Sequence, residues 1–189
     1  AEGDVASRHY PQGTLASHVV GFSGAVQPDG RYGLEGIEYT LDARLQAGLD
    51  VRLTLDPTLQ AAAERQLERS VLESGAENGS VVMLEVGSGR VLAAANYPTF
   101  DPNAQGAYGR DALVNQAFLL QYEPGSVMKP FVVGALLQSG RLAPDETIEA
   151  PPTLRVGDKT FRDVARHPDE LEVRDVLRYS SNTAMLALT

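Results

Sequence analysis

A serine and a lysine stand one helical turn apart at Ser126 and Lys129, directly after the residues Tyr-Glu-Pro-Gly at 122–125. The proline and glycine end any preceding element, and Ser126 is a favourable N-cap residue. The apolar run at 131–137 then predicts a buried helix that ends near Gly140. Because residues three apart share a helix face, the pair offers a hydroxyl nucleophile with its own amine base.

Lys129 stands where the local rules of helix formation disfavour it, since a cation in the first turn opposes the positive end of the helix dipole. Such violations tend to mark functional sites. Burial would lower the lysine pKa and let the amine accept the proton of the serine hydroxyl. The ordinary alternative is an N-cap serine followed by a surface lysine.

A second polar group, Ser180-Ser181-Asn182, interrupts an apolar helical pattern that runs over 172–177 and resumes at Ala184. Serine and asparagine compete for backbone hydrogen bonds and are indifferent helix formers. The ordinary interpretation is a turn between two short helices, or an N-cap for the second helix. The functional interpretation places this group in one cleft with Ser126.

The two groups together resemble the first two of the three motifs of penicillin-binding proteins and serine β-lactamases, Ser-x-x-Lys and Ser-x-Asn. Further stretches are similar, in the expected order, to class B penicillin-binding proteins. In the first part these are Arg8-His9-Tyr10-Pro11 with Gly13, Ala16, His18 and Gly21, and then Gly33, Gly36 and Glu38. In the second part they are residues 53–60, 89–93 and 97–103. The resemblance covers nearly the whole chain.

This resemblance implies a peptidoglycan D,D-transpeptidase that cross-links stem peptides through a serine acyl-enzyme and is acylated by β-lactams. By the family's pattern Ser126 is the nucleophile and Lys129 activates it, while Ser180 relays a proton to the leaving group and Asn182 holds the substrate amide. No cofactor is implied. The sequence of residues 122–126 is closer to that of the division-associated transpeptidases than to that of the elongation-associated ones.

The expected fold class is α+β, with a β-rich pedestal module of the dimerisation type over residues 1–48 and a partial transpeptidase domain over 49–189. Within the latter, Asp56 and Pro57 predict the start of a helix whose buried face carries Leu59, Ala63, Leu67 and Val71 and which Gly75 ends. Residues 81–86 and 90–95 predict an antiparallel hairpin, and residues 153–156 and 159–161 predict a smaller one.

The family's third motif, Lys-Thr-Gly on a strand, is expected far beyond Asn182 and past the last residue, Thr189. Lys159-Thr160 is followed by Phe161 and precedes the second motif, so it does not substitute. The missing strand would supply one donor of the oxyanion hole, and losing such a donor lowers turnover about 100- to 1,000-fold. We therefore expect this chain by itself to be weakly active or inactive.

Composition limits the partners. The chain has 189 residues, a formal charge of −9 and no basic run, which argues against binding to nucleic acid. His9, His18 and His167 are far apart and lack the spacing of metal ligands, so no metal is expected. No apolar stretch approaches the roughly 20 residues of a membrane span. By the resemblance, a single N-terminal anchor outside this sequence would hold the protein at the outer face of the cytoplasmic membrane.

Two other classes of function remain open. The chain could be a non-catalytic interaction module whose pedestal binds other cell-wall synthesis or division proteins, with the partial catalytic domain as a folded support. It could also be a β-lactam sensor or a β-lactamase, although the stretch from Arg8 to Glu38 argues against these because they share only the serine motifs.

Overall fold

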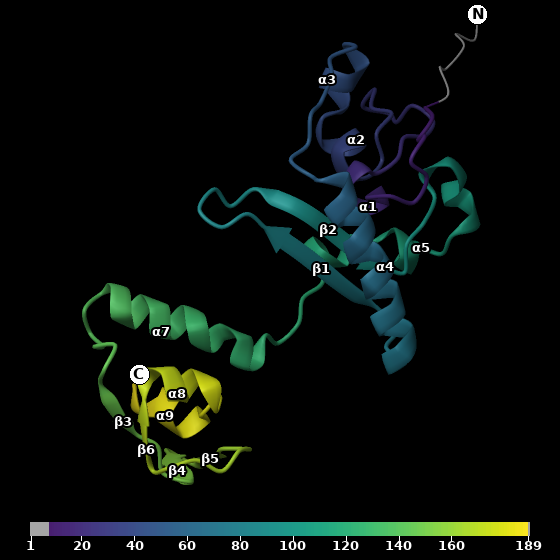
Figure 1. The fold of residues 1–189 in the computed structure, drawn as a ribbon. Coiled ribbons are helices and arrows are strands. Elements are labelled where there is room, and N and C mark those ends of the chain that lie inside the picture. The colour runs from purple at the N-terminus through teal and green to yellow at the C-terminus, as the bar shows by residue number, and fades with distance from the viewer. Residues whose placement is uncertain (1–7, 189) are drawn as a thin grey trace, which may run out of the picture. The chain divides into compact units, whose positions relative to one another are not determined.

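The computed structural model describes residues 8–188, which form two compact units divided between Gln121 and Tyr122. Helices and small antiparallel sheets alternate in it, so the expected α+β fold class is confirmed (Figure 1). None of the described helices combines the length and the apolar character that a membrane crossing requires.

The first unit is built around a long helix, α4 (Pro57–Ser74), lying across the hairpin of β1 (Gly79–Leu84) and β2 (Val91–Tyr97) (Figure 1). As predicted, the Asp56 side chain caps the helix by accepting hydrogen bonds from two backbone N–H groups, and Gly75 ends it in a left-handed conformation. The strands pair antiparallel with Val81 opposite Ala95, which confirms the larger hairpin.

The buried face of α4 differs from the prediction at one position. Ala63, Leu67 and Val71 pack against β2, but Leu59 is exposed and the neighbouring Gln60 is buried instead. The Gln60 amide accepts a hydrogen bond from the Ala94 N–H at 2.8 Å and donates one to the Ala94 carbonyl at 3.1 Å. A polar side chain lies there because the free edge of β2 needs a partner for its backbone.

The part before α4 contains less β structure than was expected of residues 1–48. In its described residues, 8–48, the strand character is confined to one isolated bridge between Ser23 and Gly33. The helices of this part are α1 (Ser17–Val20), α2 (Gly36–Thr40) and α3 (Asp42–Gln46). After the hairpin follow a 3-10 segment, η1 (Pro102–Ala107), and the short helices α5 (Arg110–Leu113) and α6 (Gln116–Leu119).

Close backbone packing explains two glycines of the first unit. A Cβ atom on Gly21 would lie 1.8 Å from the Glu35 carbonyl oxygen, and one on Gly33 would lie 1.9 Å from the Glu38 carbonyl oxygen. The Glu38 side chain pairs with Arg8 at 2.7 Å, which makes this glutamate a structural residue. The segments that carry Arg8, Gly21 and Gly33 to Glu38 therefore pack directly against one another.

The second unit contains the two short polar motifs. After a 3-10 turn, η2 (Gly125–Met128), come helix α7 (Lys129–Gln138) and the paired strands β3 (Thr147–Glu149) and β6 (Glu170–Glu172). Strands β4 (Thr153–Val156) and β5 (Lys159–Arg162) form the predicted smaller hairpin, and helices α8 (Val173–Arg178) and α9 (Asn182–Ala187) follow β6. The core of this unit consists of Val133, Leu142, Ile148, Ala150, Leu171, Val173, Val176 and Ala184.

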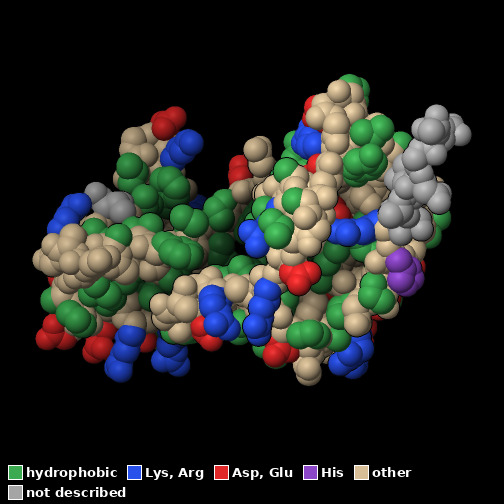
Figure 2. Space-filling model, turned by 90° about the horizontal axis from the view of Figure 1, so that it is seen from above, with side chains coloured by type: hydrophobic (Ala, Val, Ile, Leu, Met, Phe, Trp, Pro, Cys, Tyr) green, Lys and Arg blue, Asp and Glu red, His purple; other side chains and the backbone are tan. Residues whose placement is uncertain are grey.

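Charged side chains of both signs are interspersed on the face drawn in Figure 2, where lysine and arginine do not gather into one surface. This distribution agrees with the formal charge of −9.

Candidate active site

Lys129 is the first residue of α7, and Ser126 lies in the preceding 3-10 turn. The N-cap of α7 is Met128, so the prediction that Ser126 caps the helix is wrong. The helix is also less buried than its apolar sequence indicated, since only Val133 is fully buried and Phe131 is 70% exposed. The Lys129 N–H donates to the Ser126 carbonyl, so the two residues lie one turn apart on the same side.

The Lys129 ammonium contacts the second motif. Its Nζ donates to the Ser180 carbonyl, to Ser180 Oγ at 3.2 Å and to Asn182 Oδ1 at 2.8 Å. None of the hydrogen bonds within residues 8–188 joins Lys129 Nζ to the Ser126 hydroxyl, which is exposed. The structure therefore brings together three of the four predicted site residues and leaves the Ser126 hydroxyl unengaged.

The protonation of Lys129 follows from these contacts. Three acceptors use all three protons of an ammonium, so the arrangement fits the charged lysine. Burial lowers the pKa of Lys129 below its usual value, and the nearby charge of Asp163 opposes part of this effect. When the amine is neutral, one contact must reverse. Ser180 Oγ is the only one of the three acceptors that carries a proton to donate.

Ser180 holds a backbone conformation that usually requires glycine. It follows the last turn of α8 with φ 53°, and its N–H donates to the Leu177 carbonyl while the Ser181 N–H donates to the Val176 carbonyl. These two bonds form a Schellman motif with serine at the left-handed position. A left-handed serine costs about 1 kcal/mol, and strain of this kind is a feature of functional sites.

The next two residues begin α9. The Ser181 side chain accepts a hydrogen bond from the Ala184 N–H at 3.0 Å and so caps the helix. The Asn182 side chain donates from Nδ2 to the Arg162 carbonyl at 3.0 Å, which directs its Oδ1 toward Lys129. The ordinary prediction for this tripeptide, a turn between two helices with an N-cap for the second, is thus confirmed.

A buried carboxylate that the sequence analysis missed holds this turn. Asp163 Oδ1 accepts hydrogen bonds from the Asn182 and Thr183 N–H groups, the latter at 3.3 Å. Its Oδ2 accepts from the Ser181 and Thr183 hydroxyls, both at 2.7 Å, and lies 2.8 Å from His167 Nε2. One carboxylate therefore binds three consecutive residues of the turn.

The charge on Asp163 is stabilised inside the protein. The side chains of Asp163 and His167 are each only 3% exposed. Burial by itself raises the pKa of Asp163, but the hydrogen bonds from Ser181, Thr183 and Asn182 outweigh it and hold the pKa at about 2. In the sequence, Asp163 follows a short strand and resembles an ordinary loop residue. The signal that could have found it is His167, which stands four positions after Asp163.

Comparison with known proteins identifies the region that carries both motifs. The family model described as "Penicillin binding protein transpeptidase domain" matches residues 79–189. The probable peptidoglycan D,D-transpeptidase PenA of Neisseria gonorrhoeae is 33% identical over 207 residues, a match that covers 96% of this chain and 35% of PenA. The peptidoglycan D,D-transpeptidase FtsI of Escherichia coli K12 is 31% identical, and the match covers 96% of this chain and 34% of FtsI. This chain thus spans about a third of these relatives.

Solved structures show the same relationship. The crystal structure of penicillin-binding protein 3 from Mycobacterium tuberculosis is similar with a TM-score of 0.79 and 36% identity, over 96% of this chain and 43% of that one. That protein has also been solved in complex with aztreonam and with ampicillin, both β-lactams.

Proposed function

The chain belongs to the penicillin-binding protein transpeptidase family, as a class B member, and from this premise we propose that its protein is a peptidoglycan D,D-transpeptidase that acts in cell division. The observation that carries the proposal is the contact of Lys129 Nζ with both Ser180 Oγ and Asn182 Oδ1. It joins the lysine of the first motif to both polar residues of the second.

In the proposed reaction, Ser126 Oγ attacks the carbonyl carbon of the penultimate D-alanine of a stem peptide, and Lys129 takes its proton. The peptide C–N bond breaks, the nitrogen of the departing terminal D-alanine receives a proton through Ser180, and an ester to Ser126 remains. The amine of a neighbouring stem peptide then attacks this ester, which forms the cross-link and returns the proton to Ser126. Asn182 binds the amide of the substrate.

The electrostatics support these roles. A partly buried lysine with a lowered pKa releases its proton more readily than an exposed one, as a base at neutral pH requires. When Lys129 is neutral, the Ser180 hydroxyl can donate to it, and this reversible contact is what a proton relay needs. Ser126 lies one turn before the amine with its hydroxyl free of other partners within the described chain, so it is available to a substrate.

The same serine is proposed to react with β-lactams, as the complexes of the mycobacterial relative with ampicillin and aztreonam suggest by analogy. The proposed working location is the outer face of the cytoplasmic membrane, with a single N-terminal anchor. Other cell-wall synthesis and division proteins are the proposed partners, and residues 1–48 are proposed as the pedestal module that meets them. The proposed boundary with the transpeptidase domain remains between residues 48 and 49.

The proposal is tested by intact-mass analysis after incubation with a reactive penicillin. We expect the whole gene product to gain one penicillin adduct, and the Ser126→Ala variant to gain none. Ser139→Ala is the matched control, because this serine lies at the other end of the same helix and is exposed. Its variant should be acylated like the wild type.

An adduct that persists in Ser126→Ala, or a whole gene product that forms none, would overturn the assignment of Ser126. The second result would favour the non-catalytic interaction module instead. Running the 189-residue chain in parallel shows whether the two motifs described here suffice for acylation.

A further inference from the structure

His167 has a hydrogen-bond acceptor at each ring nitrogen. Its Nδ1 lies 2.8 Å from the Pro168 carbonyl oxygen and its Nε2 lies 2.8 Å from Asp163 Oδ2. A neutral imidazole carries one N–H, so it can satisfy only one of these acceptors, whereas an imidazolium satisfies both. The His167 and Asp163 side chains are each 3% exposed, so water does not replace the N–H that Asp163 receives.

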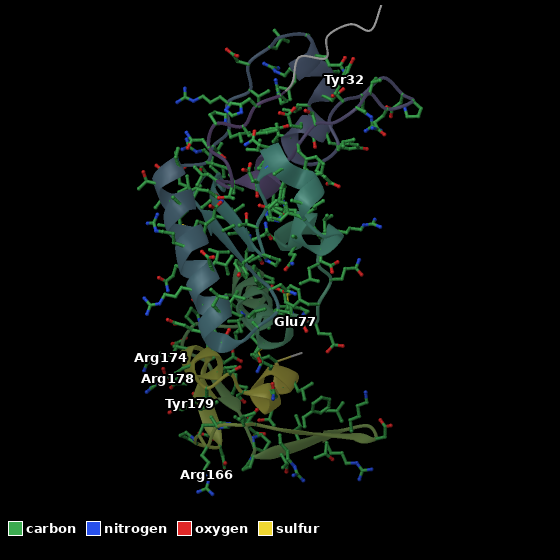
Figure 3. All side chains as sticks on the ribbon, turned by 90° about the vertical axis from the view of Figure 1, so that its right-hand side faces the viewer. Tyr32, Glu77, Arg166, Arg174, Arg178 and Tyr179 are labelled. Carbon is green, nitrogen blue, oxygen red and sulfur yellow. The ribbon has the colours of Figure 1, made fainter. Side chains whose placement is uncertain are left out.

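The groups around the ring favour this cation. Asp169 adds a second negative charge, and the Tyr179 ring packs against the imidazole with the centroids 5.7 Å apart. The Arg178 guanidinium lies over the Tyr179 ring, 5.4 Å from its centroid, and also pairs with Asp175 at 3.7 Å. Arg166 extends away from this unit, as Figure 3 shows. The hydrogen bond to the Pro168 carbonyl raises the pKa of His167 and burial lowers it, but the two aspartates tip the balance upward.

We propose that His167 is a positioning residue, held as an imidazolium, which through Asp163 keeps the turn of residues 180–183 in the arrangement that Lys129 contacts. Within residues 8–188, the hydrogen bonds and the ring contact of His167 go to Pro168, Asp163 and Tyr179 rather than to either serine motif. Its influence passes through Asp163, whose two oxygens bind Ser181, Asn182 and Thr183. The effect on acylation rests on the proposed function, but the effect on the turn does not.

The direction of the pH dependence follows from the two groups. Because folding raises the pKa of His167, its contribution is fully present below the unfolded value of about 6.5 and is lost as the pH rises through the folded value. Because folding lowers the pKa of Asp163 to about 2, its contribution is present above about 3.9 and is lost as the pH falls toward 2. The turn is therefore best ordered between these limits, and loosens above the folded pKa of His167.

The first measurement is the titration of His167 by NMR in the wild-type chain, with its resonance assigned by comparison with His167→Gln. We expect a midpoint above 6.5 and, below that midpoint, protons on both nitrogens. Hydrogen exchange of the Asn182 and Thr183 amides is followed over the same range. For each pH unit by which folding raises the pKa of His167, the protection of these two amides against exchange should fall about tenfold once the pH exceeds the midpoint.

Two variants separate charge from packing. In His167→Gln, the hydrogen-exchange protection of the turn should already be lost at pH 6. In His167→Lys, which keeps a cation, the protection should be restored and should stay constant up to pH 8. His9→Gln is the matched control, since His9 is an exposed histidine of the other unit. A His167 midpoint at or below 6.5, or protection of the turn that is unchanged across the titration, would overturn the proposal.

Acylation by a penicillin provides a separate readout in the whole gene product. If both proposals hold, the ratio of the wild-type acylation rate to the His167→Lys rate decreases as the pH rises past the His167 midpoint. If His167 titrates as expected and the turn loosens with it, while Ser126 is never acylated, the proposed function fails and the positioning role stands. If acylation occurs and this ratio is unchanged by pH, His167 does not position the turn for the reaction.

Discussion

Gln60 in the first compact unit and Asp163 in the second are buried polar side chains that each hold a backbone segment, and these two anchors differ in charge. In the first, the neutral Gln60 amide satisfies both backbone groups of Ala94 on β2. In the second, the charged Asp163 binds the turn that carries the second motif and is itself paired with His167. A neutral amide suits a permanent structural contact, whereas a carboxylate and an imidazole can make the position of the turn that carries the second motif depend on protons.

The largest effect should come from removing the charged anchor. Asp163→Ala leaves His167 and the donors of residues 181–183 buried without their acceptor, so we expect a loss of about 3–5 kcal/mol in the stability of the second unit. Hydrogen exchange of α8 and α9 measures this free energy for the unit by itself. Asp158→Ala, at the exposed turn between β4 and β5, should change it by less than about 0.5 kcal/mol. Equal effects of the two substitutions would contradict the anchoring role.

The neutral anchor should give a smaller and pH-independent effect. Gln60→Leu keeps the side-chain volume but leaves the N–H and carbonyl of Ala94 unsatisfied, so we expect about 2–3 kcal/mol of destabilisation in the first unit. The Gln60 amide also donates to Glu64 Oε1 at 2.7 Å, so hydrogen exchange of β2 is followed between pH 6 and 8 to check both the size and its constancy. Gln66→Leu, on the exposed side of the same helix, serves as the control. A loss that varies with pH would break the contrast between the two anchors.

Acid should weaken the second unit through Asp163. Its folded pKa is about 2 and its ordinary pKa about 3.8, so its contribution is complete above pH 4 and disappears as the pH falls to 2. The linked free energy is about 2 kcal/mol. It is measured as the difference in urea stability between wild type and Asp163→Asn, followed from pH 5 to pH 2. A difference that stays constant over this range would show that Asp163 does not titrate with folding.

The smallest effect on stability should come from Ser180→Gly, a substitution that also removes the hydroxyl of the proposed proton relay. Ser180→Gly relieves the left-handed strain at φ 53°, so we expect stabilisation by about 0.5–1 kcal/mol. The same change removes the hydroxyl that contacts Lys129, and penicillin acylation should fall sharply. Ser139→Gly, at a residue with ordinary right-handed geometry, should bring no such gain. Destabilisation by Ser180→Gly would show that the hydroxyl contact outweighs the strain.

Elements that depend on neighbouring residues were predictable. Asp56, Pro57 and Gly75 set the ends of α4, and the two hairpins lie where their apolar runs and glycine turns indicated. These features are local because a cap or a turn involves partners within a few residues. The domain boundary at residue 48 stays a prediction.

Residues whose roles depend on distant partners were not predictable. Gln60 lies beside a predicted apolar stripe, and its burial follows from the free edge of β2, which is 34 positions away in the sequence. Asp163 meets its turn across 18 to 20 positions, and His167 was considered only as a metal ligand. Ser126 was placed at the right turn but given the wrong capping role.

The sequence by itself determined the main helix, the two hairpins, the turn at Ser180 and the two motifs that place the chain in its family, because spacing, caps and turn residues act over short distances. Only the tertiary structure decided that Lys129 meets Ser180 and Asn182, that Asp163 holds their turn, and that His167 lies between Asp163 and the Pro168 carbonyl. Those properties depend on burial and on which acceptors surround a group. Both arise only when segments far apart in the chain pack together.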